Sequence, residues 1–187
     1  MSENSADAAP RVLVVLAHPA LERSRANRAM AQAAAELPGV AVHDLYEEYP
    51  DFLIDVAAEQ PRLQASDHIV LQFPLYWYST PSLLKEWIDR VWLHGFAYGS
   101  GGDALAGKTL MVACSAGSPS SDYAPGGTHH YSMDEFLKPL ERTAALCRMT
   151  WAPPFILNDS RIAPPAALAA SVADYAGRLK ALAGEDA

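Results

Sequence analysis

The chain has 187 residues, half of them hydrophobic, and 22 acidic against 14 basic residues give it a formal net charge of −8. This balance argues against nucleic acid as a partner, and no apolar stretch is long enough to predict a membrane-spanning helix. We expect a disordered leader at residues 1–10, followed by a single domain with a sizeable core over residues 11–187.

The cysteines and histidines do not show the spacing of a metal site. Cys114 and Cys147 lack the spacing of metal ligands, and no apolar signal segment opens the chain, so we expect buried thiols in the reducing cytoplasm. The adjacent pair His129-His130 is a poor chelate, and no metal site is predicted. Three further histidines occur singly and receive no role: His43, His68 and His94.

Strand-like and helix-like patterns alternate along the chain. RVLVVLA (11–17) is typical of a strand buried on both faces of a parallel sheet. An alanine-rich helix over 27–37 stops at Pro38-Gly39. The other predicted elements are strand 40–46, a helix around 55–64, strand 68–74, helix 82–93, strand 108–114, helix 133–147, a short strand near 151–155 and helix 166–183. Five strands alternating with five helices predict an α/β fold, a doubly wound five-stranded parallel sheet with helices on both faces.

In such a sheet, ligands bind at the carboxyl ends of the strands. The first strand is followed by His18 and then by Ser24-Arg25-Ala26-Asn27, which open a helix. This arrangement favours a phosphate site. The free backbone N–H groups, the Ser24 hydroxyl, the Asn27 amide and the positive end of the helix dipole would all face the same point. The alternative is an ordinary N-cap at Ser24 and an ordinary turn at His18. No GxGxxG or P-loop motif is present, so a mononucleotide is favoured over a dinucleotide.

An aromatic segment follows the third strand. Pro74 and Pro81 bracket a loop over residues 75–80. Its bulky side chains would bind a flat heteroaromatic ring, with Trp77 flanking that ring. The alternative is that Trp77 and Tyr78 plug the edge of the sheet.

The fourth strand is followed by Ser115-Ala116-Gly117-Ser118, small residues that let backbone N–H groups approach the polar edge of a ring. A phosphate site at one strand end and a ring site between the other two predict FMN.

The chain resembles the flavodoxin-like NAD(P)H:quinone oxidoreductases, the family of DT-diaphorase, and in particular the branch with the ancillary subunits of glutathione-regulated potassium efflux systems. The resemblance runs from Val12 to about Ile162 and is carried by four segments: AHPALERSRANRAM, LYEEYPDFLIDVAAEQ, QFPLYWYSTPSLLKEWIDRVWLHGFAYGSGG and CRMTWAPPF. It implies FMN rather than FAD as cofactor and NADH or NADPH as co-substrate. The flavin contacts that it implies are His18, Ser24, Arg25, Ala26, Asn27, Leu75, Tyr76, Trp77, Tyr78, Ser115, Ala116, Gly117 and Ser118.

Two positions depart from the family. Ser115 to Ser118 replace a Thr-Thr-Gly-Gly-like turn, and a histidine pair stands where relatives carry one pocket histidine. Spacing back from Pro139 favours His130, whereas spacing forward from Tyr123 gives His129. Tyr98 matches a pocket tyrosine of the family. His130, His129 and Tyr98 are the candidates that hydrogen-bond or protonate the quinone acceptor.

The resemblance implies two-electron reduction of quinones by ping-pong hydride transfer through flavin N5. The family also uses homodimers with active sites at the interface. Trp87, Trp92 and Phe96 would form such a surface or pack in the core. The alternative function is that of a flavin-binding regulatory subunit of a potassium efflux transporter, held at the inner membrane through that partner.

Overall fold

The computed structural model describes residues 11–184, so the predicted leader lies outside the described residues. A parallel sheet has the order β2-β1-β3-β4-β5, and β6 also pairs with β4. The strands are β1 (Val12–Leu16), β2 (Val40–Asp44), β3 (His68–Pro74), β4 (Thr109–Ser115), β5 (Thr150–Trp151) and β6 (Phe155–Leu157). The predicted parallel sheet is therefore confirmed.

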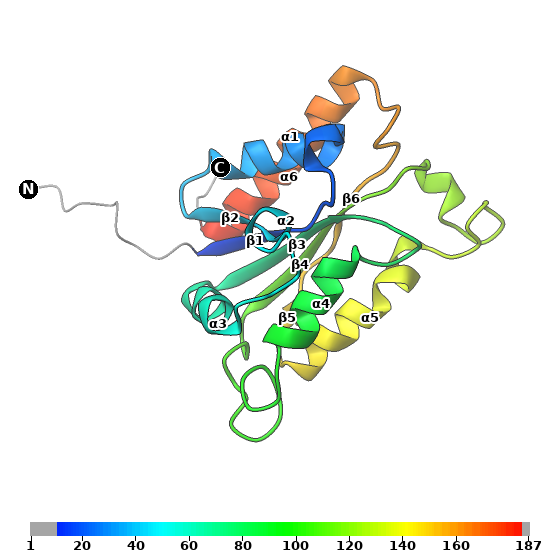
Figure 1. Cartoon of the computed structure of the whole chain (residues 1–187). Coiled ribbons are helices and arrows are strands. Elements are labelled where there is room, and N and C mark those ends of the chain that lie inside the picture. Colours follow the sequence, from blue (N-terminus) through cyan, green and yellow to red (C-terminus); the bar gives the residue numbers. More distant parts are fainter. Residues whose placement is uncertain (1–10, 185–187) are drawn as a thin grey trace, which may run out of the picture.

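Helices cover both faces of this sheet, so that the doubly wound arrangement is confirmed as well (Figure 1). Helices α1 and α6 lie on one face, and α3, α4 and α5 lie on the other. The helices are α1 (Arg25–Ala35), α2 (Leu45–Glu48), α3 (Val56–Ala65), α4 (Ser82–Val91), α5 (Met133–Leu146) and α6 (Pro165–Ala183), with 3-10 turns at Leu21–Arg23 and Ser120–Asp122.

Side-chain alternation in the strands builds two cores. In β1, Val12 and Val14 pack toward α1 and α6, whereas Leu13 and Val15 pack toward α3, α4 and α5. All four are buried because both faces of the sheet are covered. Cys114 and Cys147 are buried as predicted.

Capping side chains fix where several helices begin. Ser24 Oγ accepts the backbone N–H of Asn27 at 3.1 Å and so starts α1. Ser132 and Glu135 form a reciprocal capping box at α5. Pro165, which directly precedes the predicted helix 166–183, is the first residue of α6, where its missing N–H costs no helical hydrogen bond.

The fifth strand differs from the prediction. Instead of one strand near 151–155, β5 pairs with the start of β4 and β6 pairs with its end. Pro153 and Pro154 lie between them and have no N–H to donate to the ladder. The second strand also ends earlier, at Asp44, because the Asp44 carboxylate caps α2 through the N–H of Tyr46 at 3.0 Å.

The suggestion that Trp87 and Trp92 form an association surface is wrong. Trp87 is fully buried and Trp92 is 5% exposed, and both belong to the core on the α4 face. Phe96 is half-buried against the same core. Trp87 of α4 and Trp92, which follows the helix, both face inward, so the alternative of core burial holds.

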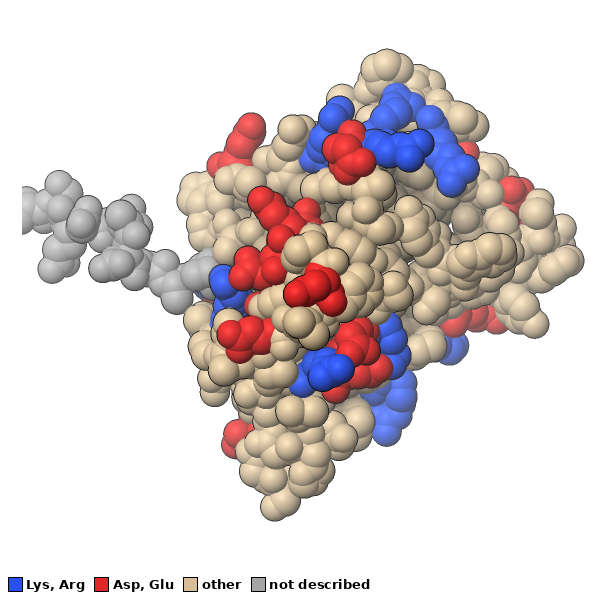
Figure 2. Space-filling model, viewed as in Figure 1, with Lys and Arg blue, Asp and Glu red and all other residues tan. Residues whose placement is uncertain are grey.

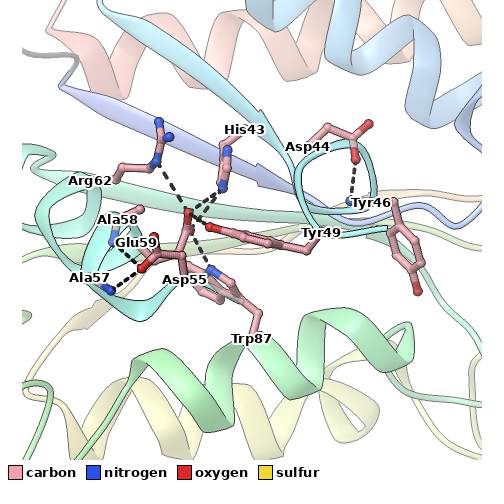
Figure 3. Close-up of polar contacts among 10 residues, drawn as sticks. All are labelled: His43, Asp44, Tyr46, Tyr49, Asp55, Ala57, Ala58, Glu59, Arg62 and Trp87. Atoms are coloured by element: carbon pink, nitrogen blue, oxygen red, sulfur yellow. Dashed lines mark hydrogen bonds and ion pairs between the residues drawn. The ribbon is translucent and has the colours of Figure 1, made fainter. Parts of the chain in front are cut away.

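A buried carboxylate, Glu59, connects several elements on the α3 and α4 face of the sheet (Figure 3). Glu59 of α3 is 0% exposed and accepts hydrogen bonds from Trp87 Nε1 at 2.7 Å, Tyr49 OH at 2.7 Å and His43 Nε2 at 3.1 Å. Arg62 Nε lies 3.5 Å from the same carboxylate. Burial alone would raise the pKa of Glu59, but the hydrogen bonds from His43, Tyr49 and Trp87 lower the pKa overall. We call Glu59, His43, Tyr49 and Trp87 the Glu59 cluster.

Candidate functional site

A cavity of about 550 Å³ opens where the carboxyl ends of β1, β3 and β4 meet the start of α1. Seven of the residues predicted from the sequence line it: His18, Ser24, Arg25, Leu75, Tyr76, Ser115 and Gly117. Five lining residues were not predicted: Ala20, Arg23, Pro74, Ser160 and Arg161. The structure thus brings the three strand ends together at one opening.

The start of α1 presents hydrogen-bond donors to this cavity. The backbone N–H groups of Arg25 and Ala26 belong to the first turn and have no acceptor within the helix. Together with the positive end of the helix dipole, they favour an anion there. The Ala26 side chain is buried on the α6 side of the sheet, so only its backbone is available to a ligand.

Asn27 lies behind the cavity and anchors its wall. The side chain is 1% exposed, and Nδ2 donates to Ser115 Oγ at 2.8 Å. Gln72 Nε2 donates to the backbone oxygen of Asn27 at 3.0 Å, and Tyr175 OH donates to Gln72 Oε1 at 3.0 Å. Asn27 Oδ1 is buried and has no hydrogen-bond partner among the described residues. This chain of hydrogen bonds fixes the first turn of α1 against β3 and β4.

His18 contributes a neutral ring to the wall. The backbone N–H of Ala20 donates to His18 Nδ1 at 3.1 Å, so the proton of the neutral ring is on Nε2. Burial lowers the pKa of His18, although Glu22 and Asp44 act in the opposite direction. The ring packs edge-on against Tyr76 at 6.2 Å between centroids. His18 therefore offers an N–H donor rather than a positive charge.

The aromatic segment forms a two-residue hairpin turn. Tyr76 and Ser79 exchange both backbone hydrogen bonds, at 2.9 and 3.0 Å, and Trp77 and Tyr78 between them have φ values of 50° and 62°. The Trp77 side chain is 94% exposed, so it does not plug the core. It lies next to the cavity in sequence without lining it. Tyr78 is half-exposed and packs against Phe136 with ring centroids 5.0 Å apart.

Of the residues at the end of β4, some line the cavity and others are buried or lie outside it. Gly117 lines the cavity, and a Cβ placed on it would meet no atom within 4 Å, so the space beside it is open. Ala116 is buried and pairs with β6 through the backbone oxygen of Leu157 at 2.8 Å. Ser118 lies outside the lining, and its Oγ is 3.0 Å from His129 Nε2.

The two adjacent histidines differ in their contacts. His129 stacks on Tyr123 with centroids 4.4 Å apart and lies 3.4 Å, through Nδ1, from Tyr78 OH. His130 is exposed and adopts a φ of 62°. The sequence spacing favoured His130, but the structure places His129 against Tyr78 and Ser118, two of the predicted flavin contacts.

Tyr98 is not brought to the cavity of its own chain. It lies in the loop 92–108, at the bottom of Figure 1, whereas the aromatic turn lies at the right of the view. Arg148, which precedes β5, donates to the backbone oxygen of Gly102 in this loop at 2.8 Å. Tyr98 packs against His94 with centroids 5.6 Å apart. The loop thus belongs to the amino edge of the sheet, opposite the cavity.

Two of the lining residues that were not predicted lie after the last strand. Ser160 and Arg161 follow β6, a strand end for which no site residue was predicted. A ligand site shared by all strand ends would have included them. Arg23 precedes the cap Ser24 by one residue and carries no motif that distinguishes it from a solvent-exposed arginine.

A family model described as flavodoxin-like fold matches residues 10–181. The chain belongs to this flavodoxin-like family. It is 50% identical over 151 residues to the glutathione-regulated potassium-efflux system ancillary protein KefG of Cronobacter sakazakii, a match that covers 81% of this chain and 82% of the relative.

Two solved structures have the same fold and are similar in sequence. General stress protein 14 of Treponema denticola, in complex with FMN, is 40% identical with a TM-score of 0.88, covering 92% of this chain and 99% of that one. A protein of P. pentosaceus described as an NADPH-quinone reductase is 31% identical with a TM-score of 0.83, covering 90% and 97%. Within residues 11–184, no helix is both long and apolar enough to cross a membrane.

Proposed function

We propose that the chain is an FMN-dependent NAD(P)H:quinone oxidoreductase that reduces quinones by two electrons. The observation that carries this proposal is the cavity that is lined jointly by the start of α1, by Leu75 and Tyr76, and by Gly117. The likeness to an FMN complex and to a quinone reductase supports it.

The phosphate end of the cavity fits FMN. Ser24 caps α1, and the N–H groups of Arg25 and Ala26 remain for phosphate oxygens. His18 Nε2–H adds a neutral donor on the same wall. The buried Asn27 Oδ1 has no partner among the described residues, and a hydroxyl of the ribityl chain would satisfy it. No dinucleotide fingerprint is present, which favours FMN over FAD.

The ring end fits a flavin as well. Gly117 leaves open space beside the cavity wall, which allows its backbone to approach the polar edge of a ring. Tyr76 holds one side, and the exposed indole of Trp77 is free to cover the ring. Bound FMN would supply the two-electron carrier between nicotinamide and quinone.

His129 takes the role of proton donor to the acceptor in place of His130. Its ring is fixed by Tyr123 and by Ser118 Oγ at 3.0 Å, which holds the imidazole in one orientation. Tyr78 OH, 3.4 Å from His129 Nδ1, would complete a short proton-transfer chain at the aromatic turn. A fixed ring beside the proposed flavin edge is better placed for acid catalysis than the exposed His130.

A homodimer would give Tyr98 a function. The residue lies at the edge of the sheet opposite its own cavity, so a second copy of the chain must supply it if it contacts the acceptor. Sedimentation velocity tests the dimer. If the chain is monomeric at working concentrations, or if Tyr98→Phe leaves quinone reduction unchanged, then Tyr98 has no place in the site.

The decisive experiment follows the bound cofactor and then its turnover. Heat-released chromophore identified by mass should be FMN. Rapid mixing of the holoprotein with NADH or NADPH, and then with a quinone, should resolve two separate half-reactions. Recovery of FAD, or failure to take up FMN, would refute the cofactor proposal.

A second candidate function is that of an ancillary subunit of a potassium efflux transporter. The 50% identity to KefG favours it. In that case the chain would be cytoplasmic and held at the inner membrane by its partner. A holoprotein that reduces no quinone, yet changes potassium efflux when produced together with the transporter, would establish this candidate over the enzyme.

A further inference from the structure

Arginines gather around the start of α1. Figure 2 shows basic side chains clustered over the beginning of this helix, although the whole chain carries a net charge of −8. Arg23, Arg25 and Arg161 all line the cavity at this end. Arg23 precedes α1, Arg25 is its first residue, and Arg161 lies in the distant loop after β6.

The guanidinium of Arg25 is hydrogen-bonded to backbone oxygens of the protein. Its Nη1 donates to the backbone oxygen of Arg161 at 2.9 Å, and its Nη2 donates to the backbone oxygen of Ala163 at 3.0 Å. These two bonds hold the loop after β6 against the first turn of α1. The side chain of Arg25 is therefore engaged in positioning this loop, and only its backbone N–H remains for a ligand.

The guanidinium groups of Arg23 and Arg161, in contrast, have no partner among the described residues. Among residues 11–184, no carboxylate lies within ion-pair distance of either guanidinium, whereas Arg62, Arg90 and Arg178 all have acidic partners. Neither side chain donates a hydrogen bond to another residue within the described part of the chain. Two unpartnered cations therefore border a cavity that already contains the positive end of a helix dipole.

We propose that Arg23 and Arg161 bind the phosphate of FMN, and that Arg25 is a positioning residue that holds Arg161 in place. The inference rests on the proposed function, because it assigns residues to the same cavity. Arginine supplies several N–H donors in a planar fork that matches phosphate oxygens, so two arginines and the helix N-terminus suit a dianion. A flavin without the phosphate would gain nothing from them.

The test compares FMN with riboflavin, which lacks the phosphate. Both are titrated into apoprotein by quenching of flavin fluorescence. Arg23→Gln and Arg161→Gln should each weaken FMN binding by about 10- to 100-fold and leave riboflavin binding unchanged. Arg28→Gln is the matched control, because Arg28 is exposed on α1 and contacts only the backbone oxygen of Glu22, at 3.4 Å. It should bind both flavins as the wild type does.

Arg25 is tested by a double-mutant cycle. Arg25→Gln should weaken FMN binding, and the Arg25→Gln, Arg161→Gln double variant should be no weaker than Arg161→Gln alone. A merely structural role for Arg25 would instead weaken FMN and riboflavin together and would add to the effect of Arg161→Gln. Thermal melts of the apoproteins identify any variant that has lost its fold.

Two outcomes separate the failure of this inference from that of the proposed function. If the wild type binds FMN, but Arg23→Gln and Arg161→Gln bind it equally well or lose both flavins equally, the phosphate role is overturned. If the wild type binds neither flavin, the proposed function fails and the inference falls with it.

Discussion

The Glu59 cluster and the cavity at the start of α1 are both rich in polar groups, but they differ in what satisfies them. Glu59 is enclosed and accepts hydrogen bonds from Trp87, Tyr49 and His43. The cavity instead borders side chains with no acidic partner among the described residues and helix N–H groups with no acceptor within the helix. Polarity that the protein satisfies internally serves the fold, whereas polarity left open at a cavity indicates a ligand.

The largest effect should come from breaking the cluster. Glu59→Ala leaves three buried donors without an acceptor, so we expect a loss of about 3–5 kcal/mol in the free energy of unfolding, measured by urea denaturation. Glu48→Ala, at an exposed position of α2, is the control and should be nearly neutral. A loss below about 1 kcal/mol for Glu59→Ala would mean that the cluster does not hold this face of the sheet together.

The histidine pair tests the cavity side of the comparison. His129→Gln should slow electron transfer to quinone by about 10- to 100-fold in stopped-flow measurements, while reduction by NAD(P)H changes little. His130→Gln should leave both half-reactions unchanged, since the side chain is exposed. The reverse ranking would restore His130 as the proton donor, and equal rates for all three proteins would assign the proton to water.

Two tryptophans sharpen the contrast between the regions. Trp77 is 94% exposed, so Trp77→Phe should leave the stability of the apoprotein unchanged, and Trp77→Ala should weaken FMN binding by about 3- to 10-fold. Trp87→Phe removes the N–H that bonds Glu59 and should cost about 1–3 kcal/mol without changing FMN affinity. Apoprotein melts and flavin titrations of both variants provide the comparison. Unaltered flavin binding by Trp77→Ala would remove Trp77 from the site.

The smallest effect concerns pH. The pKa of His18 is lowered by burial, so below the ordinary histidine pKa of about 6.5 the unfolded state binds this proton more readily than the folded state. Stability should therefore fall as pH decreases through that value. His68 contributes with the same sign, since burial lowers its pKa too. His18→Gln should remove part of the slope in thermal melts between about pH 5 and 8. An unchanged slope would show that His18 titrates normally.

Much of the site could be predicted because a parallel sheet gathers its strand ends. His18, Leu75 and Gly117 were identified from the residues that follow apolar runs, and all three line one cavity. Arg161 was missed because Pro153 and Pro154 interrupt the apolar run, so that β6 was not recognised as a strand with an end of its own.

Other features depend on geometry that local patterns do not carry. The Glu59 cluster joins residues from β2, the end of α2, α3 and α4, and His43 gave no signal by itself. Tyr98 was placed with the pocket by resemblance, yet a helix between two parallel strands returns the chain to the amino edge. A residue in the loop after α4 is therefore expected at the edge opposite the cavity, and this signal was available in the order of the elements.

The break between β5 and β6 also affects how copies of the chain meet. These strands form one border of the described sheet, and an uninterrupted border strand is a template for adding strands from other molecules. Pro153 and Pro154 divide it into pieces of two and three residues, too short to direct continuous strand addition. The same two prolines that obscured the strand in the sequence thus protect against sheet-to-sheet aggregation at this border.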